Sequence, residues 1–459
     1  MSAPPANSAA APAARETVPD TPVAPKGREY AKTRKRTVTK RGVLWLGQTC
    51  DARCYFCYFL DRIADNKHEE HAFMSLEKAK KICHTLRYTY GNTSIDIQGG
   101  EPTIYPPILE LIQYCDEIGL YPTLITNGLS LAKPGRLEKF KEAGVRDFLV
   151  SLHGLGETHD EVVVRKGAST KIITAIERMI ELDIPFRFNC TMSKPVVVQL
   201  PDLARKAVEY GANAVNFIAF NPFGDQEGRR TAENVAKYTE IKPYLTEAMD
   251  ILDEHGIECN VRYLPICMAE PRHRKNFYNM QQLTYDHHEW NYESWLWTMM
   301  QPQMMKEGET VPAGLIGVGA GRMYRGPVKF PGDKQALFGS IEAPARIRDL
   351  YQKHKVLGPL AMTAQHAASK VMQAVKGKEE LLRTEAKVRA SVDCHYQYEP
   401  SCEQCACRTI CDGFHGDYAE FFGTGEAQPI TDIPPTDDPL TFIKEQDKIV
   451  EEEDKHWAL

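Results

Sequence analysis

The segment VLWLGQTCDARCYFC, residues 43–57, joins a short apolar run to three closely spaced cysteines. The run VLWLG has the length and composition of a buried strand. Cys50, Cys54 and Cys57 follow it on what must be a loop, with three and two residues between them. Three thiolates on one loop can hold three irons of a 4Fe-4S cluster and leave the fourth iron without a protein ligand. A closed structural zinc site needs four ligands, and this loop offers no fourth cysteine or histidine.

Short apolar runs and amphipathic stretches alternate along the following part of the chain. The runs predict six strands, at residues 43–47, 94–98, 122–126, 147–152, 185–191 and 213–219. A seventh run covers residues 257–264, and the stretches between the runs have helical periodicity. Strands that are joined through helices run parallel in one sheet. The sequence therefore predicts an α/β fold, a partial (β/α)6 barrel of the TIM type rather than a full eight-fold barrel.

The composition is ordinary for a globular protein: 459 residues with 56 Lys and Arg against 62 Asp and Glu, hence a net charge of −6. No apolar run reaches the roughly 18–20 residues that a membrane span requires. The N-terminus has no apolar segment of the kind that directs secretion, so we expect a cytoplasmic protein. The acidic balance argues against nucleic acid as a partner. Thirteen cysteines in a reducing compartment indicate metal ligands, rather than disulfides, where they cluster.

The Cys-x3-Cys-x2-Cys spacing resembles that of the radical S-adenosylmethionine (radical SAM) enzymes, and the resemblance covers about residues 42–265. It implies an enzyme in which Cys50, Cys54 and Cys57 hold a 4Fe-4S cluster that cleaves SAM reductively. The resulting 5′-deoxyadenosyl radical abstracts hydrogen from a substrate. The resemblance also implies an electron donor such as flavodoxin or ferredoxin. It places Phe56, which precedes the third cysteine, against the adenine of SAM.

Further residues at successive strand ends resemble the SAM contacts of this family. They are Gly99, Gly100 and Glu101 for the amino group, Ser151 for the carboxylate or ribose, Arg165 for the carboxylate, Asn189 for the ribose, and Asn127 in the weaker match Thr126-Asn127-Gly128. Glycines allow a backbone to approach a ligand closely. His153 departs from the family pattern, because relatives often place an acidic residue at this position.

A second cysteine group, Cys402-x2-Cys405-x5-Cys411, lies near the C-terminus, and Cys267 lies far upstream. This arrangement resembles the SPASM and Twitch extensions and implies an auxiliary 4Fe-4S cluster on these four cysteines. His415 stands where the fuller pattern has another cysteine, which favours one auxiliary cluster over two. Cys394 and Cys407 are surplus and can substitute as ligands. A structural zinc on Cys402, Cys405, Cys407 and Cys411 is the alternative.

The domain organisation follows from these signals. We predict a disordered Ala/Pro-rich and then basic segment at residues 1–41, the core barrel at 42–265, a mainly helical region with the substrate insertion and auxiliary cluster at 266–425, and an acidic tail at 426–459. Within these, the basic stretch from Lys26 to Arg41 fits a solvated linker or a clamp for an anion. Residues 440–456 have the pattern of a charged helix, and Asp286 to Glu289 that of surface hydrogen-bonding groups, a proton carrier or metal ligands.

The substrate does not follow from the motifs. Peptide maturases of the family often carry a leader-binding domain, and only 42 residues precede Val43. A small molecule or lipid precursor is therefore preferred, with a peptide or protein maturase as the alternative substrate class. A non-catalytic iron–sulfur or zinc carrier is the alternative from another functional class. Cobalamin is not expected, because Asp286-x-His288 lacks the glycine of the cobalamin-binding motif.

Overall fold

A curled parallel sheet forms the centre of the computed structural model, which describes residues 30–57, 73–220, 231, 233–300, 322–330, 332–342 and 357–459. Its strands are β2 (Arg41–Trp45), β3 (Ser94–Gln98), β4 (Tyr121–Thr126), β5 (Asp147–Ser151), β6 (Phe186–Met192), β7 (Ala214–Ala219), β8 (Glu258–Arg262) and β9 (Phe277–Tyr278). They are hydrogen-bonded in chain order, and every pair is parallel. The predicted partial barrel and its seven apolar runs are confirmed. β9, with two residues, is too short for a periodic pattern to reveal.

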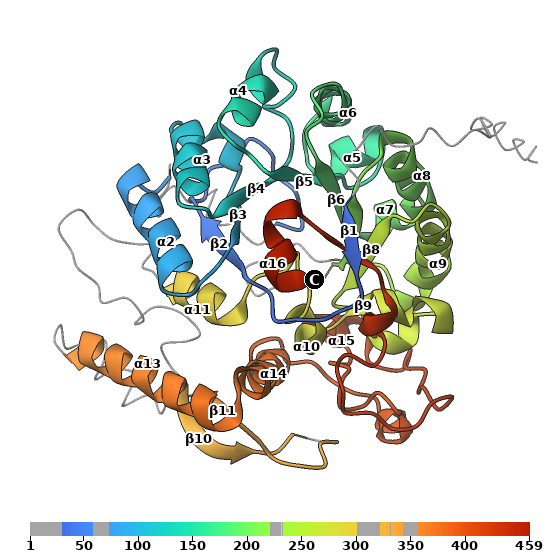
Figure 1. The fold of residues 1–459 in the computed structure, drawn as a ribbon. Helices are drawn as coiled ribbons and strands as arrows, with labels where there is room; N and C mark the ends of the chain where they lie inside the picture. Colours follow the sequence, from blue (N-terminus) through green and yellow to red (C-terminus); the bar gives the residue numbers. More distant parts are fainter. Residues whose placement is uncertain are drawn as a thin grey trace, which may run out of the picture.

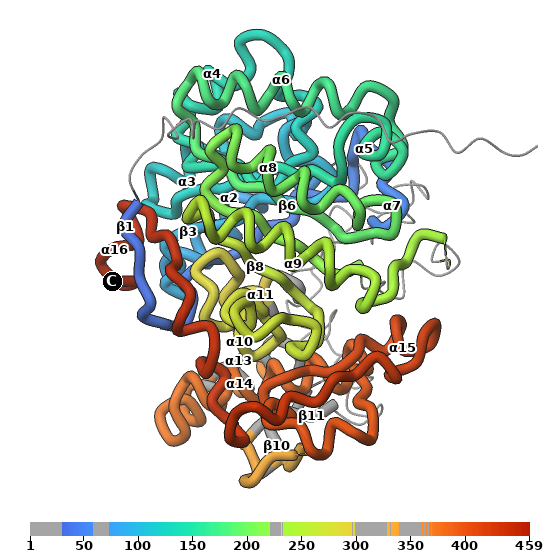
Figure 2. Tube along the Cα trace, turned by 90° about the vertical axis from the view of Figure 1, so that its right-hand side faces the viewer, coloured from blue at the N-terminus to red at the C-terminus, as the bar shows by residue number. Residues whose placement is uncertain are grey.

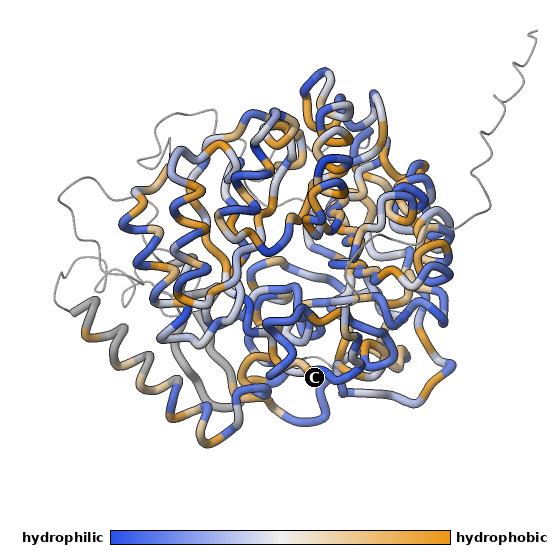
Figure 3. The backbone as a smooth tube through the Cα atoms, turned by 45° about the horizontal axis from the view of Figure 1, so that its top comes forward, coloured by the Kyte–Doolittle hydropathy of each residue, from blue (hydrophilic) through white to orange (hydrophobic). Residues whose placement is uncertain are grey.

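Helices surround the outer face of this sheet (Figure 1). They are α2 (Leu76–Tyr88), α3 (Ile108–Glu117), α4 (Arg136–Glu142), α5 (Glu157–Val162), α6 (Ala168–Glu181), α7 (Lys194–Val197), α8 (Leu200–Tyr210) and α9 (Tyr238–Glu254). Hydrophobic and hydrophilic residues alternate along them, as the hydropathy colours of Figure 3 show. In α6, for example, Ile172, Ile176 and Met179 are buried on one side. The main hydrophobic core therefore lies between the helices and the outer face of the sheet.

The inner face of the barrel is polar toward the N-terminal ends of its strands. Side chains alternate between the two faces of a strand, and Arg41 and Asp96 meet inside with a nitrogen–oxygen distance of 2.7 Å. Arg187 of β6 pairs with Asp147 of β5 at the same distance. All four side chains are buried. The barrel lumen is thus filled by ion pairs at this end, so the opposite end remains for ligands.

The C-terminal segment closes the N-terminal end of the barrel, where α16 (Lys455–Ala458) lies inside the ring of strands in Figure 1. The charged helix predicted at residues 440–456 is wrong. The segment instead forms the short strand β12 (Lys448–Val450), the turns η7 (Ile443–Glu445) and η8 (Glu452–Asp454), and α16. Its acidic side chains form ion pairs with a basic side chain of the barrel: Glu451 and Asp454 contact Arg146 at 3.4 and 3.0 Å. Local charge patterning could not distinguish this arrangement from a solvated helix.

The basic N-terminal stretch binds the same C-terminal segment, while Lys32, Arg34 and Lys35 stay exposed. β1 (Ala31–Thr33) pairs antiparallel with β12. Arg34 forms an ion pair with Asp447 at 2.7 Å, and Arg36 donates to the carbonyls of Ile443 and Gln446. The linker interpretation is therefore wrong for residues 30–41. The Ala/Pro-rich part predicted to be disordered lies outside the described residues.

A mainly helical extension lies beside the barrel (Figure 2), as the sequence predicts. It contains η3 (Ile266–Met268), η4 (Pro271–Asn276), α10 (Met280–Leu283), α11 (Tyr292–Met300), the antiparallel hairpin β10 (Arg322–Val328) and β11 (Leu337–Glu342), α13 (Leu357–Lys376), α14 (Lys378–Val388), the π-helical turn η5 (Arg389–Asp393), η6 (Pro400–Gln404) and α15 (Gly416–Phe422). An isolated parallel bridge joins Trp290 to Arg41 of β2. The chain after β9 thus returns to the first strand of the sheet. No helix in the described ranges has both the length and the apolarity to cross a bilayer.

Candidate active site

The three-cysteine loop follows β2 at the C-terminal end of the sheet. Backbone hydrogen bonds fix it to two neighbours: Arg53 N donates to Val163 O (3.0 Å), and Glu101 N donates to Thr49 O (2.8 Å). Cys50, Cys54 and Cys57 are half-buried on this loop. Ligand sites of parallel barrels lie at this end of the strands. The fold therefore places the predicted cluster ligands where such a site is expected.

Polar hydrogens already point at the first of these sulfurs. The Ala52 N–H donates to Cys50 Sγ (3.4 Å), and Asn127 Nδ2 donates to the same sulfur (3.7 Å). Burial, followed by the charge of Glu101, raises the pKa of the Cys50 thiol to about 12. Coordination to iron removes this proton, and N–H groups directed at a cysteine sulfur stabilise its thiolate form. The donor set therefore fits an iron–sulfur cluster.

The spacing of the sulfurs also bears on the choice of metal. A tetrahedral zinc, with Zn–S distances of about 2.3 Å, brings its sulfurs to about 3.8 Å from one another. Within the described ranges, no three cysteine sulfurs lie within 4.8 Å of one another. Neither cysteine group in the described ranges thus has three sulfurs already placed as a tetrahedral zinc site requires.

Gly99 and Gly100 are required by contact with the cysteine loop. A Cβ at Gly100 would lie 2.0 Å from Thr49 O, and one at Gly99 would lie 2.7 Å from Gly47 O. Gly100 N donates to Gly47 O (2.9 Å), so the backbone of β3 continues its pairing along this loop. The structure gives these glycines a packing reason. Their predicted contact with the amino group of SAM stays a prediction.

Glu101 connects the end of β3 to the loop after β4. Its Oε1 accepts hydrogen bonds from Thr103 N (3.0 Å) and from the hydroxyls of Thr103 (2.5 Å) and Thr126 (2.7 Å). Its Oε2 accepts from Asn127 N (2.7 Å), and Asn127 Nδ2 in turn donates to Asp51 Oδ1 (2.8 Å). Burial raises the pKa of Glu101 to about 7, although these hydrogen bonds oppose the shift. The carboxylate thus positions Asn127 against the cysteine loop.

Replacing Glu101 with Gln should destabilise this corner of the site. The amide has one acceptor oxygen, so a buried N–H or hydroxyl loses its partner at a cost of about 1–3 kcal/mol in the free energy of unfolding. Chemical denaturation measures this loss. Glu110→Gln is the control, because the Glu110 side chain is 58% exposed in its ion pair with Lys80. Equal stabilities of the two variants would contradict the positioning role.

The other predicted SAM contacts fall into two groups. Arg165 Nη1 donates to the backbone oxygen of Asp51 (2.9 Å), so it lies beside the cysteine loop with Asn127. Ser151 and Asn189 are direct neighbours in the register of β5 and β6. Asn189 Oδ1 is buried and accepts no hydrogen bond from any of the described residues. The sequence does not single out Asp51, which binds both Asn127 and Arg165, although its place inside the cysteine motif is a usable signal.

Phe56 stands in an aromatic group with the histidine that departs from the family pattern. Its ring lies 4.7 Å from the ring of His153, edge to face, and 6.1 Å from that of Phe220. His153 Nδ1 accepts a hydrogen bond from Thr191 N (3.0 Å), and His159 Nδ1 accepts from His153 N (3.1 Å). His153 therefore joins the ends of β5 and β6 and supports Phe56.

These two histidines predict a loss of stability in acid. Burial lowers the pKa of His153 to about 3, with a further contribution from His159, and burial lowers that of His159 to about 4. The unfolded chain takes up these protons below about pH 6.5, while the folded chain does not, so the free energy of unfolding falls as the pH drops below that value, by up to about 1.4 kcal/mol per histidine per pH unit. Urea unfolding from pH 7 to pH 5 should show a weaker pH dependence in His153→Gln/His159→Gln than in His255→Gln, whose histidine is exposed. Parallel pH profiles would refute the assignment.

The C-terminal cysteines gather in one cavity with Cys267. Cys267, Cys402, Cys405, Cys407 and Cys411 all line it, together with Tyr398 and Arg408. Ile430 N donates to Cys405 Sγ (3.3 Å), and Gly413 N donates to Cys411 Sγ (3.4 Å). The topology thus brings a remote cysteine to the C-x2-C-x5-C group, and the donor set fits a second cluster.

Cys394 and His415, whose roles the sequence does not decide, lie outside this cavity. Cys394 is buried in a separate apolar cluster with Tyr396. His415 caps the start of α15, where its Nδ1 accepts from Asp417 N (3.3 Å), and its ring lies 5.0 Å from that of Tyr396. Neither residue lines the cysteine cavity. Cys407 therefore remains as the one surplus cysteine beside the predicted four.

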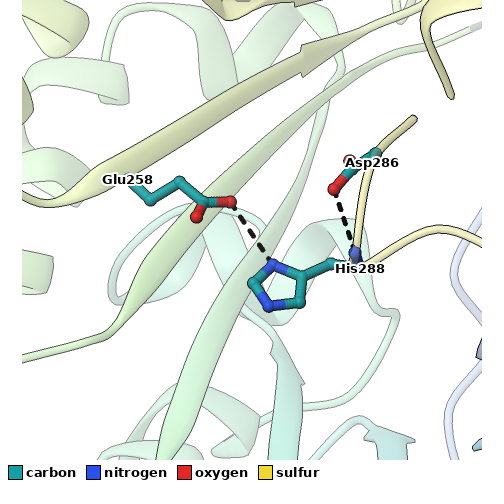
Figure 4. A group of neighbouring side chains, drawn as sticks. All are labelled: Glu258, Asp286 and His288. Carbon is teal, nitrogen blue, oxygen red and sulfur yellow. Dashed lines mark hydrogen bonds and ion pairs between the residues drawn. The ribbon is translucent and has the colours of Figure 1, made fainter. Parts of the chain in front are cut away.

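A third group of side chains has the residue types of a metal site, but the ammonium of Lys448 from the same chain contacts its carboxylates. Ligand atoms of Glu258, Asp286 and His288 lie within 4.8 Å of one another at the N-terminal end of the barrel (Figure 4). Lys448 Nζ reaches Glu258 Oε1 at 2.5 Å and Asp286 Oδ1 at 2.8 Å. The Lys448 ammonium thus supplies the positive charge between the carboxylates. The expectation that Asp286 to Glu289 lie at the surface is wrong, since all four are buried.

Comparison with known proteins adds the following. Residues 46–206 match the family model of the radical SAM superfamily. A probable GTP 3′,8-cyclase from Sulfurisphaera tokodaii is 26% identical over 48% of this chain and 67% of its own length. An AdoMet-dependent heme synthase from Methanosarcina barkeri is 30% identical over 41% and 53%, and a PqqA peptide cyclase from Bradyrhizobium diazoefficiens is 26% identical over 46% and 54%. The chain thus spans about half to two thirds of these relatives. The crystal structure of Streptococcus suis SuiB bound to S-adenosylmethionine aligns over 49% of this chain and 50% of that one, with 19% identity and a TM-score of 0.41.

Proposed function

We propose, on the premise that residues 46–206 form a radical SAM superfamily domain, that this protein cleaves SAM reductively and uses the 5′-deoxyadenosyl radical to abstract hydrogen from a substrate. The observation that carries the proposal is the juxtaposition of Cys50 with Asn127 and Asp51 at the strand ends. A simple iron–sulfur carrier has no need of this arrangement. When bound, the cluster and SAM supply the radical chemistry.

The residues of this chain would bind and orient these groups. Cys50, Cys54 and Cys57 would hold the reducing cluster. The backbone of Gly99 to Glu101, with Asn127, Ser151, Arg165 and Asn189, would seat SAM, and Phe56 would pack on its adenine. The acceptor Asn189 Oδ1, to which no described residue donates, supports a ligand hydroxyl at that position. An external donor such as flavodoxin or ferredoxin would supply the electron.

The substrate class stays open between a small molecule or lipid precursor, which we prefer, and a peptide or protein. The names of the relatives include a GTP cyclase, a heme synthase and a peptide cyclase, so they do not select one. The preference is supported by the aromatic and methionine-rich segment around α11, which suits an apolar ligand.

Anaerobic reconstitution tests the function directly. The full chain is loaded with iron and sulfide, reduced with dithionite and given SAM, and 5′-deoxyadenosine and methionine are quantified by chromatography. We expect both products in equal amounts, with none in the sample that lacks reductant. A fully loaded, SAM-binding protein that yields no 5′-deoxyadenosine would refute the proposal and favour an electron carrier.

A further inference from the structure

A cavity of about 320 Å³ lies at the closed end of the barrel, outside the lumen that the ion pairs fill. Its walls come from distant parts of the chain: β1, the starts of β5, β6 and β7, and the C-terminal segment from β12 to α16. Figure 1 shows β1 and α16 at this end of the ring of strands. The volume falls in the range of small-molecule sites.

Carboxylates outnumber cations in this cavity. The charged residues of its lining are Asp147, Glu451, Glu452, Glu453, Arg146 and Lys455. Both cations are already paired. Arg146 contacts Glu451 and Asp454 at 3.4 and 3.0 Å, and Lys455 contacts Glu452 at 2.5 Å. The cavity therefore favours a positively charged ligand and offers no unpaired cation to an anion.

One oxygen of a buried carboxylate in the lining lacks a donor. Glu451 is only 5% exposed, and its Oε1 contacts His288 Nε2 (3.1 Å) and Arg41 Nη2 (3.7 Å) of the barrel. Its Oε2 is buried and accepts no hydrogen bond from any described residue. A buried acceptor without a donor costs about 1–3 kcal/mol. A ligand N–H group in the cavity would remove this cost.

The rest of the lining suits an alkylammonium ligand. Among the described residues, none donates a hydrogen bond to the half-buried Glu453 carboxylate or forms an ion pair with it. The ring of Tyr30, whose hydroxyl accepts from Asn213 Nδ2 (3.1 Å), provides an aromatic wall. Aromatic rings attract ammonium groups, and Val450 adds an apolar surface for a carbon chain.

A metal ion fits the cavity less well than an organic cation. A divalent ion needs several oxygen ligands at about 2.0–2.6 Å from one point. In the described ranges, three such ligand atoms come within 4.8 Å of one another only at Glu258, Asp286 and His288. The carboxylates of the cavity are thus too far apart to hold one ion together, and the volume is that of a small molecule.

We infer that this cavity binds the primary ammonium group of a small alkylamine, with Glu451 and Glu453 as acceptors and the carbon chain against Tyr30 and Val450. The site lies at the opposite end of the barrel from Cys50, so the inference goes beyond the proposed function and does not depend on it. Because the cavity joins the C-terminal segment to the barrel, a bound amine should also stabilise the folded chain.

Calorimetric titration of the full, cluster-loaded chain at pH 7 tests the site with pentylamine, 1-pentanol and magnesium chloride. We expect pentylamine to bind about tenfold more tightly than the uncharged alcohol of the same chain length, and to raise the midpoint of thermal unfolding. Glu451→Gln should weaken amine binding about tenfold and leave the alcohol unaffected. The control Glu445→Gln removes an exposed acid of η7 that does not line the cavity, and should bind as the wild type does.

Equal binding of pentylamine and 1-pentanol, or equal amine affinity in Glu451→Gln and wild type, would overturn the inference. Magnesium that binds as tightly as pentylamine would overturn it too, because it would indicate a general attraction of cations to acidic residues. Glu451 also pairs with Arg146, so its variant can fail to fold. Glu453→Gln then decides: a selective loss of amine affinity supports the site, and an unchanged titration overturns it.

Discussion

A variant in which Cys50, Cys54 and Cys57 are all replaced by alanine should form no 5′-deoxyadenosine. If two 4Fe-4S clusters place about eight irons on the wild-type chain, as we propose, this variant should retain about four. The reason is the separation of the two cysteine groups: the first follows β2, while the second lines a cavity in the extension. The second group should therefore load without the first. Iron and sulfide analysis of anaerobically reconstituted protein measures the number of clusters, and chromatography measures the product.

The reciprocal variant supplies the matched comparison. Cys402→Ala/Cys405→Ala/Cys411→Ala should lose the other four or so irons and keep the cluster on Cys50, Cys54 and Cys57. Cys83→Ala/Cys115→Ala controls for cysteine loss, because these two are buried between α2 and α3 with their sulfurs 3.5 Å apart. It should hold iron as the wild type does. Four irons and one zinc in the wild type would contradict an auxiliary cluster, and full iron content in the first triple variant would contradict the assignment of its ligands.

The barrel could be predicted because its strands carry a local signal. Runs such as 94–98 and 147–152 are apolar and bounded by turns, and the observed strands begin or end within two residues of the predicted limits. The same alternation placed Cys50, Glu101 and Asn127 at strand ends, so the predicted residues that the structure brings together share one edge of the sheet. Periodicity and topology together were sufficient for this part.

The remaining parts depend on contacts that no local pattern contains. The charges of residues 440–456 read as a helix surface, but Lys448 and Glu451 pair with groups that lie about 160 to 300 positions earlier in the chain. The glycines at positions 99 and 100 resemble a ligand-binding signal, but the contacts that require them are with the Gly47 and Thr49 carbonyls, respectively.

Lys448→Met should be the most destabilising single substitution at the closed end of the barrel. The Lys448 side chain is fully buried, and its ammonium contacts Glu258, Asp286 and Asn260 Oδ1, the last at 2.9 Å. Its charge, after the opposing effect of burial, keeps the pKa values of Glu258 and Asp286 below their usual range. Methionine leaves two buried carboxylates without this cation. Removing one partner of a buried ionic group costs about 3–5 kcal/mol, which urea unfolding at pH 7 would register as a large shift of the midpoint.

Two further variants separate this electrostatic effect from lost packing. Lys455→Met removes an exposed ammonium on α16, which pairs with Glu452 three residues earlier, and should cost no more than about 1 kcal/mol. Lys448→Met/Glu258→Gln removes one of the stranded carboxylates together with the ammonium and should recover part of the loss. In the wild type, the lowered pKa values of Glu258 and Asp286 contribute stability at neutral pH. Below about pH 4 the unfolded chain takes up protons on these carboxylates while the folded chain does not, so this stability is lost as the pH falls toward the folded-state pKa values. Lys448→Met should lose most of this acid dependence. If Lys448→Met were as stable and as acid-sensitive as Lys455→Met, the C-terminal segment would be held by packing alone.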